Sequence, residues 1–537
     1  MSTAAPASYH PRHWPRWAQA VGWAILVVGA LVMSLHRQWE GFLVATVPDW
    51  QQVLPMGTEV KALALAEDGD LYLAGNFEDT LRLGAATLVS AGETDVFIAR
   101  FDKATGTFSW AQRAGGPGYD VVNAMAVRAG QVYMAGYVGA IEPSRATMAD
   151  FGALKLPAQG ITDLYVAKLD TDAGQAHFGW VQGLPGVRNS EGQRLAVRGT
   201  TVYLVGSLEA HNGYFGITSN QAGASQKPDT TQYHQSHFLA RLTDAGARCE
   251  LTAMLMMGFD RPTFITALVA SRYPNVYLAG NYEADPLTAV RAPQDQPGTG
   301  QPNHTEARLE KYTDDGRHLL PQWRYTLGDS SETTVNALVV RNDRIYAAGA
   351  FRKHTHFQDI KLTTPAQAGF LACLTDDDTA PHPVWAVPLT SRANRASRYQ
   401  ARALALHDSA LYVAGSYEAL QPDGTNYFDK NPTLEQQFER LADYHNPGIF
   451  VSQVIDHGAT GQPHWQQLTT GDGMSFVAAL AATAGPVYVV GHFVPRVQFG
   501  RFLLSFGNTP KKRLSEGFWA KLGPAQSADK YPVEVNY

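Results

Sequence analysis

The sequence predicts an all-β fold, a seven-bladed β-propeller of four-stranded blades that is closed by an N-terminal strand and preceded by one transmembrane or signal helix. Three observations lead there: a tetrapeptide that recurs seven times, an aromatic gradient within each repeat, and one uncharged apolar run near the N-terminus. Glycine is abundant, with 49 residues, and only 17% of the 537 residues are charged. This composition favours short strands and tight turns over long charged helices.

The uncharged run covers residues 18–35 and follows Arg12 and Arg16. Eighteen helical residues rise about 27 Å, close to the roughly 30 Å hydrocarbon core of a bilayer. We therefore expect a signal anchor with everything after it outside the cytoplasm; the alternative is a cleaved signal peptide and a secreted protein. The predicted organisation is a cytoplasmic segment 1–17, the anchor 18–35, a linker 36–49, the propeller 50–522 and a tail 523–537.

The repeated motif is Tyr-x-x-Gly, and its copies lie 61 to 76 residues apart. A near-constant period of this length is typical of repeat architectures. The seven copies are 72–75, 133–136, 203–206, 277–280, 346–349, 412–415 and 488–491.

Each copy of the motif stands in the same frame. A small apolar run such as 122–127 precedes it, and an aromatic-led strand such as 97–101 and a polar turn such as 243–246 follow. The repeat ends on a strand with a tryptophan, for which Leu251 stands in the third repeat. Small residues first and bulky ones last are expected of a blade, because its innermost strand is crowded at the axis. The tryptophans are Trp110, Trp180, Trp323, Trp385 and Trp465.

The seventh repeat ends at 518–522 without a tryptophan strand, and a matching segment stands at the start of the chain instead. The run Trp50-Gln51-Gln52 is similar to Trp465-Gln466-Gln467. We therefore predict that residues 50–54 pair with residues 518–522 and complete the seventh blade. Closure would remove two exposed sheet edges, which otherwise invite aggregation.

These motifs resemble the bacterial SBBP-type β-propeller repeat over residues 50–522. The resemblance rests on Tyr-x-x-Gly, a Phe-Gly element (Phe151-Gly152, Phe215-Gly216, Phe499-Gly500), Phe-x-Ala-Lys-Leu and the tryptophan strand. It implies the architecture and assigns no catalytic residues. The third, fourth and sixth repeats depart from the pattern through long insertions.

The insertions are 217–236, 284–304 and 419–447, each between the second and third strands of its blade. Such connections emerge at the same end as the blade-to-blade connections, so we expect one elaborated face. The third insertion predicts a helix with Leu434, Phe438 and Leu441 on one stripe. This stripe either packs on its own blade or docks a partner.

Acidic residues stand near the blade-to-blade turns of six repeats, and arginines take their place in the sixth repeat. One hypothesis is a mixed-charge mouth of the central channel that binds a cation or a polar ligand; the alternative is that acids merely favour solvated turns. The acids are Glu59, Asp120, Glu191, Asp260, Glu332 and Asp472, and the arginines are Arg392, Arg395 and Arg398.

Several function classes find no support in the sequence. The net charge of −6 offers no electrostatic basis for nucleic-acid binding. Cys249 and Cys373 fit neither a disulfide framework nor a zinc site, and we expect both to be buried and unpaired. The pair His354 and His356 has no third ligand nearby, so no metal is expected. No motif for a P-loop, a serine hydrolase or a zinc protease occurs, and no cofactor is expected.

These observations favour an exported, membrane-anchored propeller that acts as a non-catalytic binding or scaffolding module. Its partner would be a protein or glycan of the envelope or the extracellular space. A first alternative is a hydrolase or lyase that acts on glycans or peptides at the channel mouth. A second is a structural surface protein.

Overall fold

A computed structural model describes most residues of the propeller, and residues 1–48 lie outside the description. The described residues form 35 strands, and no helix occurs among them. The predicted anchor 18–35 lies outside the described residues, and among the described ones no helix is long and apolar enough to cross a membrane. The described ranges are 49–55, 58–140, 147–158, 161–172, 175–183, 189–210, 234–257, 262–283, 305–328, 332–390, 398–418, 448–469, 474–494, 496–505, 516–523 and 533–536.

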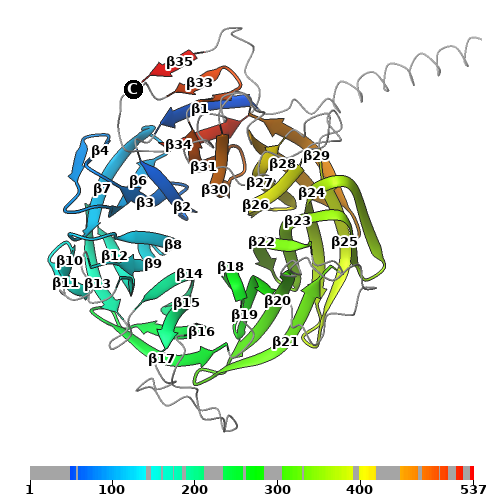
Figure 1. Ribbon diagram of the computed structural model, residues 1–537, viewed down its shortest axis with the longest axis horizontal. Helices are drawn as coiled ribbons and strands as arrows, with labels where there is room; N and C mark the ends of the chain where they lie inside the picture. Colours follow the sequence, from blue (N-terminus) through cyan, green and yellow to red (C-terminus); the bar gives the residue numbers. More distant parts are fainter. Residues whose placement is uncertain are drawn as a thin grey trace, which may run out of the picture. The chain divides into compact units, whose positions relative to one another are not determined.

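Seven sheets stand around a common axis, each a blade of four antiparallel strands, as predicted (Figure 1). The first strand of every blade is innermost. The first strands of blades 1 to 7 are β2 (Glu59–Leu65), β8 (Val121–Arg128), β14 (Ser190–Arg198), β18 (Pro262–Ala270), β22 (Thr334–Arg341), β26 (Arg398–His407) and β30 (Met474–Ala482).

The second strands carry the Tyr-x-x-Gly motif and are buried between the neighbouring blades. In blade order they are β3 (Leu71–Phe77), β9 (Gln131–Val138), β15 (Thr201–Ala210), β19 (Asn275–Glu283), β23 (Arg344–Phe357), β27 (Ala410–Glu418) and β31 (Val487–Val494). The third strands are β6 (Asp95–Asp102), β12 (Asp163–Asp172), β16 (His234–Asp244), β20 (Thr305–Asp314), β24 (Ile360–Asp376), β28 (Gly448–Asp456) and β34 (Glu516–Gly523).

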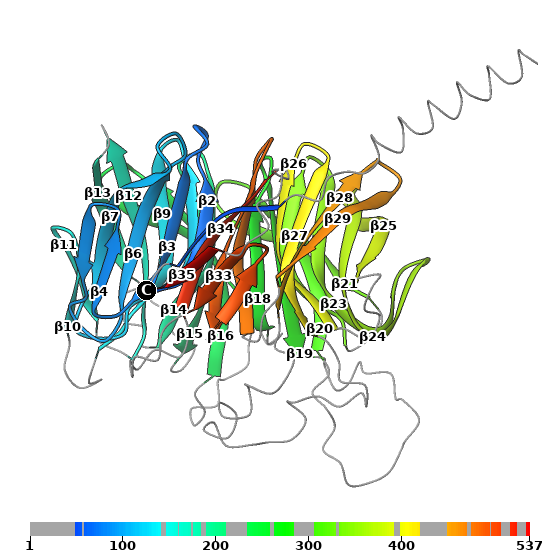
Figure 2. The same ribbon diagram turned by 90° about the horizontal axis from the view of Figure 1, so that it is seen from above.

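The fourth strands form the rim of the ring. They are β7 (Thr107–Gly115), β13 (Gln175–Gly183), β17 (Cys249–Met256), β21 (Leu319–Leu327), β25 (Pro381–Leu389), β29 (Gly461–Leu468) and, for blade 7, β1 (Asp49–Pro55). Figure 2 shows the ring from its edge, with the strands running between its two ends.

The N-terminal strand closes the ring, which confirms the predicted pairing. β1 runs antiparallel to β34, with Trp50 opposite Leu522 and Leu54 opposite Trp519. The last blade thus combines the two ends of the propeller sequence, and neither β34 nor β1 is left as a free edge of an incomplete blade.

The tryptophan positions of the third and seventh blades need correction. In β13 of blade 2, Trp180 lies opposite Lys168, next to a bulge in the third-to-fourth strand pairing. In blade 3 the residue at the position of Trp180 is Ala253, which lies opposite Arg241. In blade 7 it is Gln52, which lies opposite Lys521. Leu251 and Trp50 therefore lie two residues away from the position that the sequence comparison gave them. The bulge lies within this two-residue step, so Leu251 and Trp50 pair with Leu242 and Leu522 and lie on the opposite face of the sheet from the tryptophan position.

The predicted insertions 217–236, 284–304 and 419–447 lie outside the described residues, except that β16 starts at His234. In four blades the second-to-third connection contains a hairpin or a hairpin extension. The hairpins are β4 (Thr80–Leu83) with β5 (Ala86–Val89), β10 (Thr147–Phe151) with β11 (Leu154–Ala158), the outer halves of β23 and β24, and β32 (Arg496–Phe499) with β33 (Phe502–Ser505), which pairs in parallel with β35 (Val533–Asn536).

The Phe-Gly element forms the turn of two of these hairpins, β10–β11 and β32–β33, whereas Phe215-Gly216 lies outside the described residues. Phe151 precedes Gly152, whose φ of 60° suits a glycine, and packs on Tyr165 with ring centroids 5.0 Å apart. Phe499 packs in the same way on Phe518, at 4.8 Å. The β10–β11 hairpin also pairs with the edge of β7 and extends the first blade to six strands.

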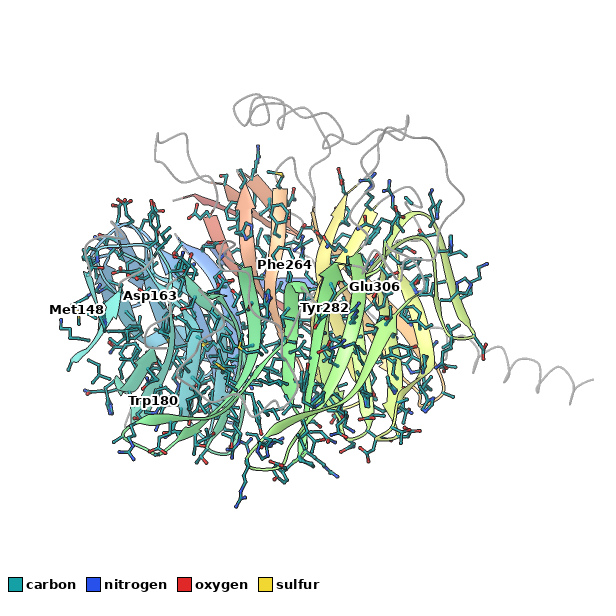
Figure 3. All side chains as sticks on the ribbon, turned by 60° about the horizontal axis from the view of Figure 1, so that its bottom comes forward. Met148, Asp163, Trp180, Phe264, Tyr282 and Glu306 are labelled. Carbon is teal, nitrogen blue, oxygen red and sulfur yellow. The ribbon has the colours of Figure 1, made fainter. Side chains whose placement is uncertain are left out.

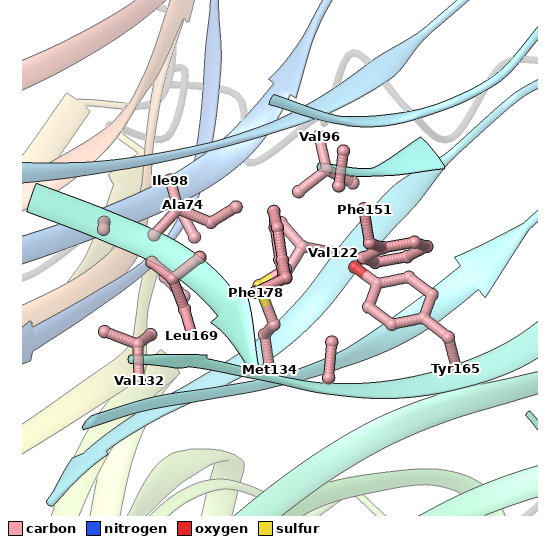
Figure 4. Packing of buried hydrophobic residues seen from close by; sticks show 14 of the residues in the cluster. Ala74, Val96, Ile98, Val122, Val132, Met134, Phe151, Tyr165, Leu169 and Phe178 are labelled. Carbon is pink, nitrogen blue, oxygen red and sulfur yellow. The ribbon is translucent and has the colours of Figure 1, made fainter. Parts of the chain in front are cut away.

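Apolar side chains fill the space between neighbouring blades. Between blades 1 and 2, Ile98 and Val96 meet Met134 and Tyr165, all of them at most 1% exposed (Figure 4). Burial of each such side chain contributes about 1.5–3 kcal/mol. The blades are too thin to fold alone, so this inter-blade core is what makes the ring one cooperative unit.

At the end opposite the second-to-third connections, an aspartate links successive blades. Asp376 ends β24 and accepts hydrogen bonds from the Tyr277 hydroxyl (2.6 Å) and the Trp323 indole (3.1 Å) of the preceding blade. Lys311 also contacts this carboxylate, at 2.7 Å. We call this arrangement the aspartate clasp. Equivalent clasps centre on Asp244, Asp314 and Asp456, with Arg241 in place of the tryptophan at Asp314.

Candidate functional site

Every first strand contains a β-bulge at the same place, and the bulged residue lies at the axial edge of the blade. In β2 the register shifts between Val60 and Ala62, which leaves Lys61 without a partner in β3. A bulge adds one residue to a strand and re-aims its side chain. The bulged residues of blades 1 to 7 are Lys61, Asn123, Gln193, Thr266, Asn336, Arg402 and Ala478.

The residues on either side of each bulge pack against other blades. Val60 lies in a buried cluster with Val490 of the seventh blade, and Ala62 lies in one with Val132 of the second. In blade 3 the flanking residues are Gly192 and Arg194, and Arg194 reaches the next blade with a hydrogen bond from Nε to the Thr266 carbonyl (2.7 Å). The bulged residue itself stays partly accessible to solvent in every blade.

A second set of partly exposed residues lies two positions before the bulge, nearer the elaborated end. We call these residues and the bulged residues together the axial mouth. The second set is Glu59, Val121, Glu191, Phe264, Thr334, Gln400 and Phe476. Among the described residues, Phe264 is the most exposed large apolar side chain, at 66%, and Figure 3 shows it on the same blade as Tyr282 and Glu306.

Hydrogen bonds fix the polar groups of the axial mouth. Lys61 donates to Glu59 (2.6 Å), and Gln193 donates to Glu191 (2.7 Å). In these two blades the bulged residue therefore orients the residue that stands two positions before it. Asn336 instead donates to the Ala401 carbonyl of the next blade (2.7 Å). Some bulged residues therefore connect neighbouring blades, and others present polar groups at the axis.

The predicted site residues fall in different places. Glu191 lies in the axial mouth. Arg398 is half-buried and is the first residue of β26, two positions before Gln400 of the axial mouth. Glu332 is exposed, stands two positions before the start of β22 and lies 3.6 Å from Arg352 of β23. Asp120 is 1% exposed, with its carboxylate accepting hydrogen bonds from the amides of Gly116 and Gly139. The other candidates, Asp260, Asp472, Arg392, Arg395 and the helix residues Leu434, Phe438 and Leu441, lie outside the described residues.

Asp120 belongs to a buried carboxylate pair with Asp95. A Cβ added to Gly115 would lie 2.5 Å from an oxygen of Asp95 and 2.7 Å from one of Asp120, so only glycine fits between them. Arg113 pairs with Asp95. Burial raises the pKa of Asp120 to about 7, although the two loop amides lower it and Asp95 raises it further. Because both carboxylates are at most 1% exposed, no substrate reaches them.

Sequence reasoning missed Lys61, Arg194, Arg402 and Phe264, as well as His492 of β31. His492 stacks on Phe476 with ring centroids 5.0 Å apart, and burial lowers its pKa, with Lys61 and Arg402 acting in the same direction. For Lys61 and Arg402 the sequence contains a pattern that could have identified them. They follow Glu59 and Gln400 by two residues, the spacing of side chains on one face of a strand.

The cysteines and the histidine pair give no site among the described residues. Cys249 and Cys373 are buried, free and on different blades, and burial raises the pKa of each thiol to about 12. The rings of His354 and His356 lie 6.2 Å apart. No group of three or more potential metal-ligating His, Cys, Asp or Glu residues occurs in the part of the chain that the structure describes.

Comparison with known proteins identifies only distant structural similarity. No protein-family profile and no curated protein matches the chain. Hydrazine synthase of Kuenenia stuttgartiensis is 9% identical, with 82% of this chain and 94% of that chain covered and a TM-score of 0.39. A protein of unknown function from Dyadobacter fermentans is 10% identical, with 71% and 96% covered and a TM-score of 0.36. Trypanosoma rangeli sialidase in complex with the inhibitor DANA is 8% identical, with 78% and 57% covered and a TM-score of 0.33.

Proposed function

We propose that the protein is an exported, membrane-anchored binding or scaffolding module that takes its ligand or partner at the axial mouth. The observation that carries this proposal is a contrast between neighbouring positions of the first strands. The residues after the bulge are alanine in six blades, because they pack against the next blade. The bulged residues change from lysine to asparagine, glutamine, threonine, arginine and alanine around the ring.

A surface built this way is chemically asymmetric although the fold is a repeat. Glu59 and Glu191 supply carboxylates, Lys61 and Arg402 supply cations, and Phe264 supplies an exposed aromatic ring. A few polar groups placed among apolar ones suit a ligand that carries several distinct groups. A bare ion would need converging ligands of one kind instead.

The export and anchoring rest on the sequence. Residues 18–35 form the uncharged run, and residues 36–49 extend at most about 46 Å between it and the ring. The tether would hold the ring close to the membrane surface, where it would meet an envelope or extracellular partner. N-terminal sequencing of the mature protein tests the anchor, and a start near residue 36 to 46 would show that it is cleaved.

Photo-crosslinking from intact cells tests the binding role. A photoreactive amino acid at Phe264 reports on the axial mouth, and one at Leu320, which is 43% exposed near the clasp end, is the matched control. We expect one reproducible crosslinked species from position 264 and none from position 320. Equal crosslinking from both positions, or none from either, would contradict the proposal.

A hydrolase or lyase would need two accessible carboxylates that flank a substrate bond. In the described residues Glu59 is paired with Lys61, Glu191 is held by Gln193, and the Asp95–Asp120 pair is buried. This arrangement favours binding over catalysis. Any turnover of a glycan or peptide that Glu191→Gln abolishes would overturn the non-catalytic proposal.

A further inference from the structure

The first strand of the sixth blade presents a row of basic and amide side chains to the axial mouth. Arg398 and Gln400 are half-buried and Arg402 is exposed, whereas the intervening Tyr399 and Ala401 are 1% and 0% exposed. Alternate residues of a strand lie on one face, so the three polar side chains share one edge of β26. We call these three residues the arginine edge.

Arg402 has an amide but no carboxylate as its partner. Its NH2 group donates to Oε1 of Gln400 at 2.9 Å, and among the described residues no carboxylate lies within ion-pair distance of it. Other arginines of the ring, such as Arg100 and Arg344, are paired with aspartates.

Among the described residues, the neighbouring blades bring one ion pair and an aromatic pair to this part of the mouth and no unpaired carboxylate. β30 and β2 follow β26 around the axis and contact one another in that order (Figure 1). They bring Phe476 and Lys61, and β31 brings His492 against Phe476. Glu59 is the one carboxylate among these mouth residues of blades 6, 7 and 1, and it is paired with Lys61 at 2.6 Å. Glu418 of β27 lies opposite Arg398 in the strand pairing, so Arg402 is the arginine of this edge that has only an amide partner among the described residues.

We propose that the arginine edge binds an oxyanion, a carboxylate or phosphate group, of the ligand that enters the axial mouth. This proposal rests on the binding role proposed above and gives its ligand a chemical class. A guanidinium donates two parallel hydrogen bonds to an oxyanion, and Gln400 holds that of Arg402 in place. The flat Phe476–His492 pair would lie against the organic part of the ligand.

Calorimetric titration of the full-length protein in detergent tests the proposal, with inorganic phosphate and succinate as separate probes at low ionic strength. We expect saturable binding of at least one probe, and the stronger of the two identifies phosphate or carboxylate as the preferred group. Arg402→Gln should weaken binding about tenfold or more, the loss expected when one charge-assisted contact is removed. Arg82→Gln, which removes an exposed charge from the outer hairpin β4, should change nothing.

A second variant guards against misfolding of the first. Gln400→Glu places a carboxylate next to Arg402 without removing the arginine, so it should abolish anion binding and leave the unfolding temperature nearly unchanged. Binding that survives Arg402→Gln or Gln400→Glu, or no binding of either probe by the wild-type protein, would overturn the proposal. If crosslinking from position 264 persists in that case, the binding role stands and only the anion inference fails; if crosslinking is also absent, both fail.

Discussion

The two ends of the ring follow different rules although the same strands connect them. At the clasp end, four successive blades repeat one arrangement, an aspartate that accepts hydrogen bonds from the tyrosine of the preceding blade and from its tryptophan or from Arg241. At the axial mouth, equivalent positions carry lysine, asparagine, threonine or arginine. The residues of the clasp are alike because each blade packs against a similar neighbour. The residues of the axial mouth differ because side chains that meet solvent or a ligand can vary without disturbing the packing.

The seam between blades 1 and 2 lacks the clasp and shows what the clasp provides. Blade 2 carries Thr171 where Asp244 stands in blade 3, and the indole nitrogen of Trp110 in blade 1 is buried without a hydrogen-bond partner. Thr171 donates instead to the Gly130 carbonyl of its own blade. At the opposite end of the same seam lie the buried Asp95 and Asp120. In place of the clasp, the seam between blades 1 and 2 is held by its apolar core and by the pairing of β10 with β7.

The largest effect is expected from opening the ring. A chain that lacks residues 1–56 loses β1 and leaves blade 7 with three strands and a free β34 edge. We expect a loss of more than about 5 kcal/mol, enough to unfold a typical domain, together with aggregation. Calorimetry and gel filtration measure this, and a chain that begins at Asp49 is the control, which should fold; equal stability of the two would refute closure by β1.

Removal of a clasp comes next. Asp376→Ala should cost about 3–5 kcal/mol, because it leaves the nearly buried Lys311, the Tyr277 hydroxyl and the Trp323 indole without their shared acceptor. Chemical unfolding measures the change. Asp377→Ala in the same turn, where the carboxylate is exposed, should cost much less, and equal losses would show that the clasp does not couple the blades.

The two ends should also respond to pH in opposite directions. Burial raises the pKa of Asp120 to about 7, above its unfolded value, so this group stabilises the fold at low pH and its contribution is lost as the pH rises through 7. Burial alone would raise the pKa of Asp376, but hydrogen bonds from Lys311 and Tyr277 outweigh it and lower the net pKa. The clasp therefore stabilises above the unfolded pKa of about 4 and weakens as the pH falls below it.

Stability measured from pH 5 to 8 in wild type and in Asp120→Asn isolates the mouth-end contribution. We expect the wild type to lose about 2–4 kcal/mol more than the variant over this range, since asparagine does not titrate. Parallel pH curves for the two proteins would show that Asp120 keeps an ordinary pKa.

A smaller effect, and a gain, is expected from rebuilding the missing clasp. Thr171→Asp offers the Trp110 indole nitrogen an acceptor and should stabilise the ring by about 1 kcal/mol, the usual contribution of one hydrogen bond. Thermal unfolding checks the gain. Thr171→Asp combined with Trp110→Phe is the control, because without the indole N–H the gain should disappear; a loss of stability in the single variant would contradict the assignment.

The smallest effect is expected from an exposed residue of the mouth end. Glu332→Gln removes an exposed ion pair with Arg352 and should change stability by less than about 0.5 kcal/mol. Urea unfolding against wild type measures it. A cost similar to that of Asp376→Ala would remove the contrast between the two ends.

Much of the fold could be predicted from the residues, whereas the site could be predicted only in part. The Tyr-x-x-Gly repeats, the order of strands within a blade and the pairing of β1 with β34 are confirmed. The tyrosines and tryptophans were recognised as blade positions, but nothing in their spacing shows that Tyr133 and Trp180 meet Asp244 of the next blade. Membership of the SBBP-type repeat family, the anchor 18–35 and the binding role remain predictions.

The sequence by itself determined the number of blades, the direction of the small-to-bulky gradient and the end at which insertions gather. These features depend on local residue patterns. The patterns recur along the sequence because every blade packs in the same way. Only the tertiary structure decided which side chains share the axis, because bulges shift the register of every first strand and place Lys61 and Arg402 at the mouth. It also placed Asp120 in a buried pair, since contacts between blades far apart in sequence follow from ring closure and not from spacing.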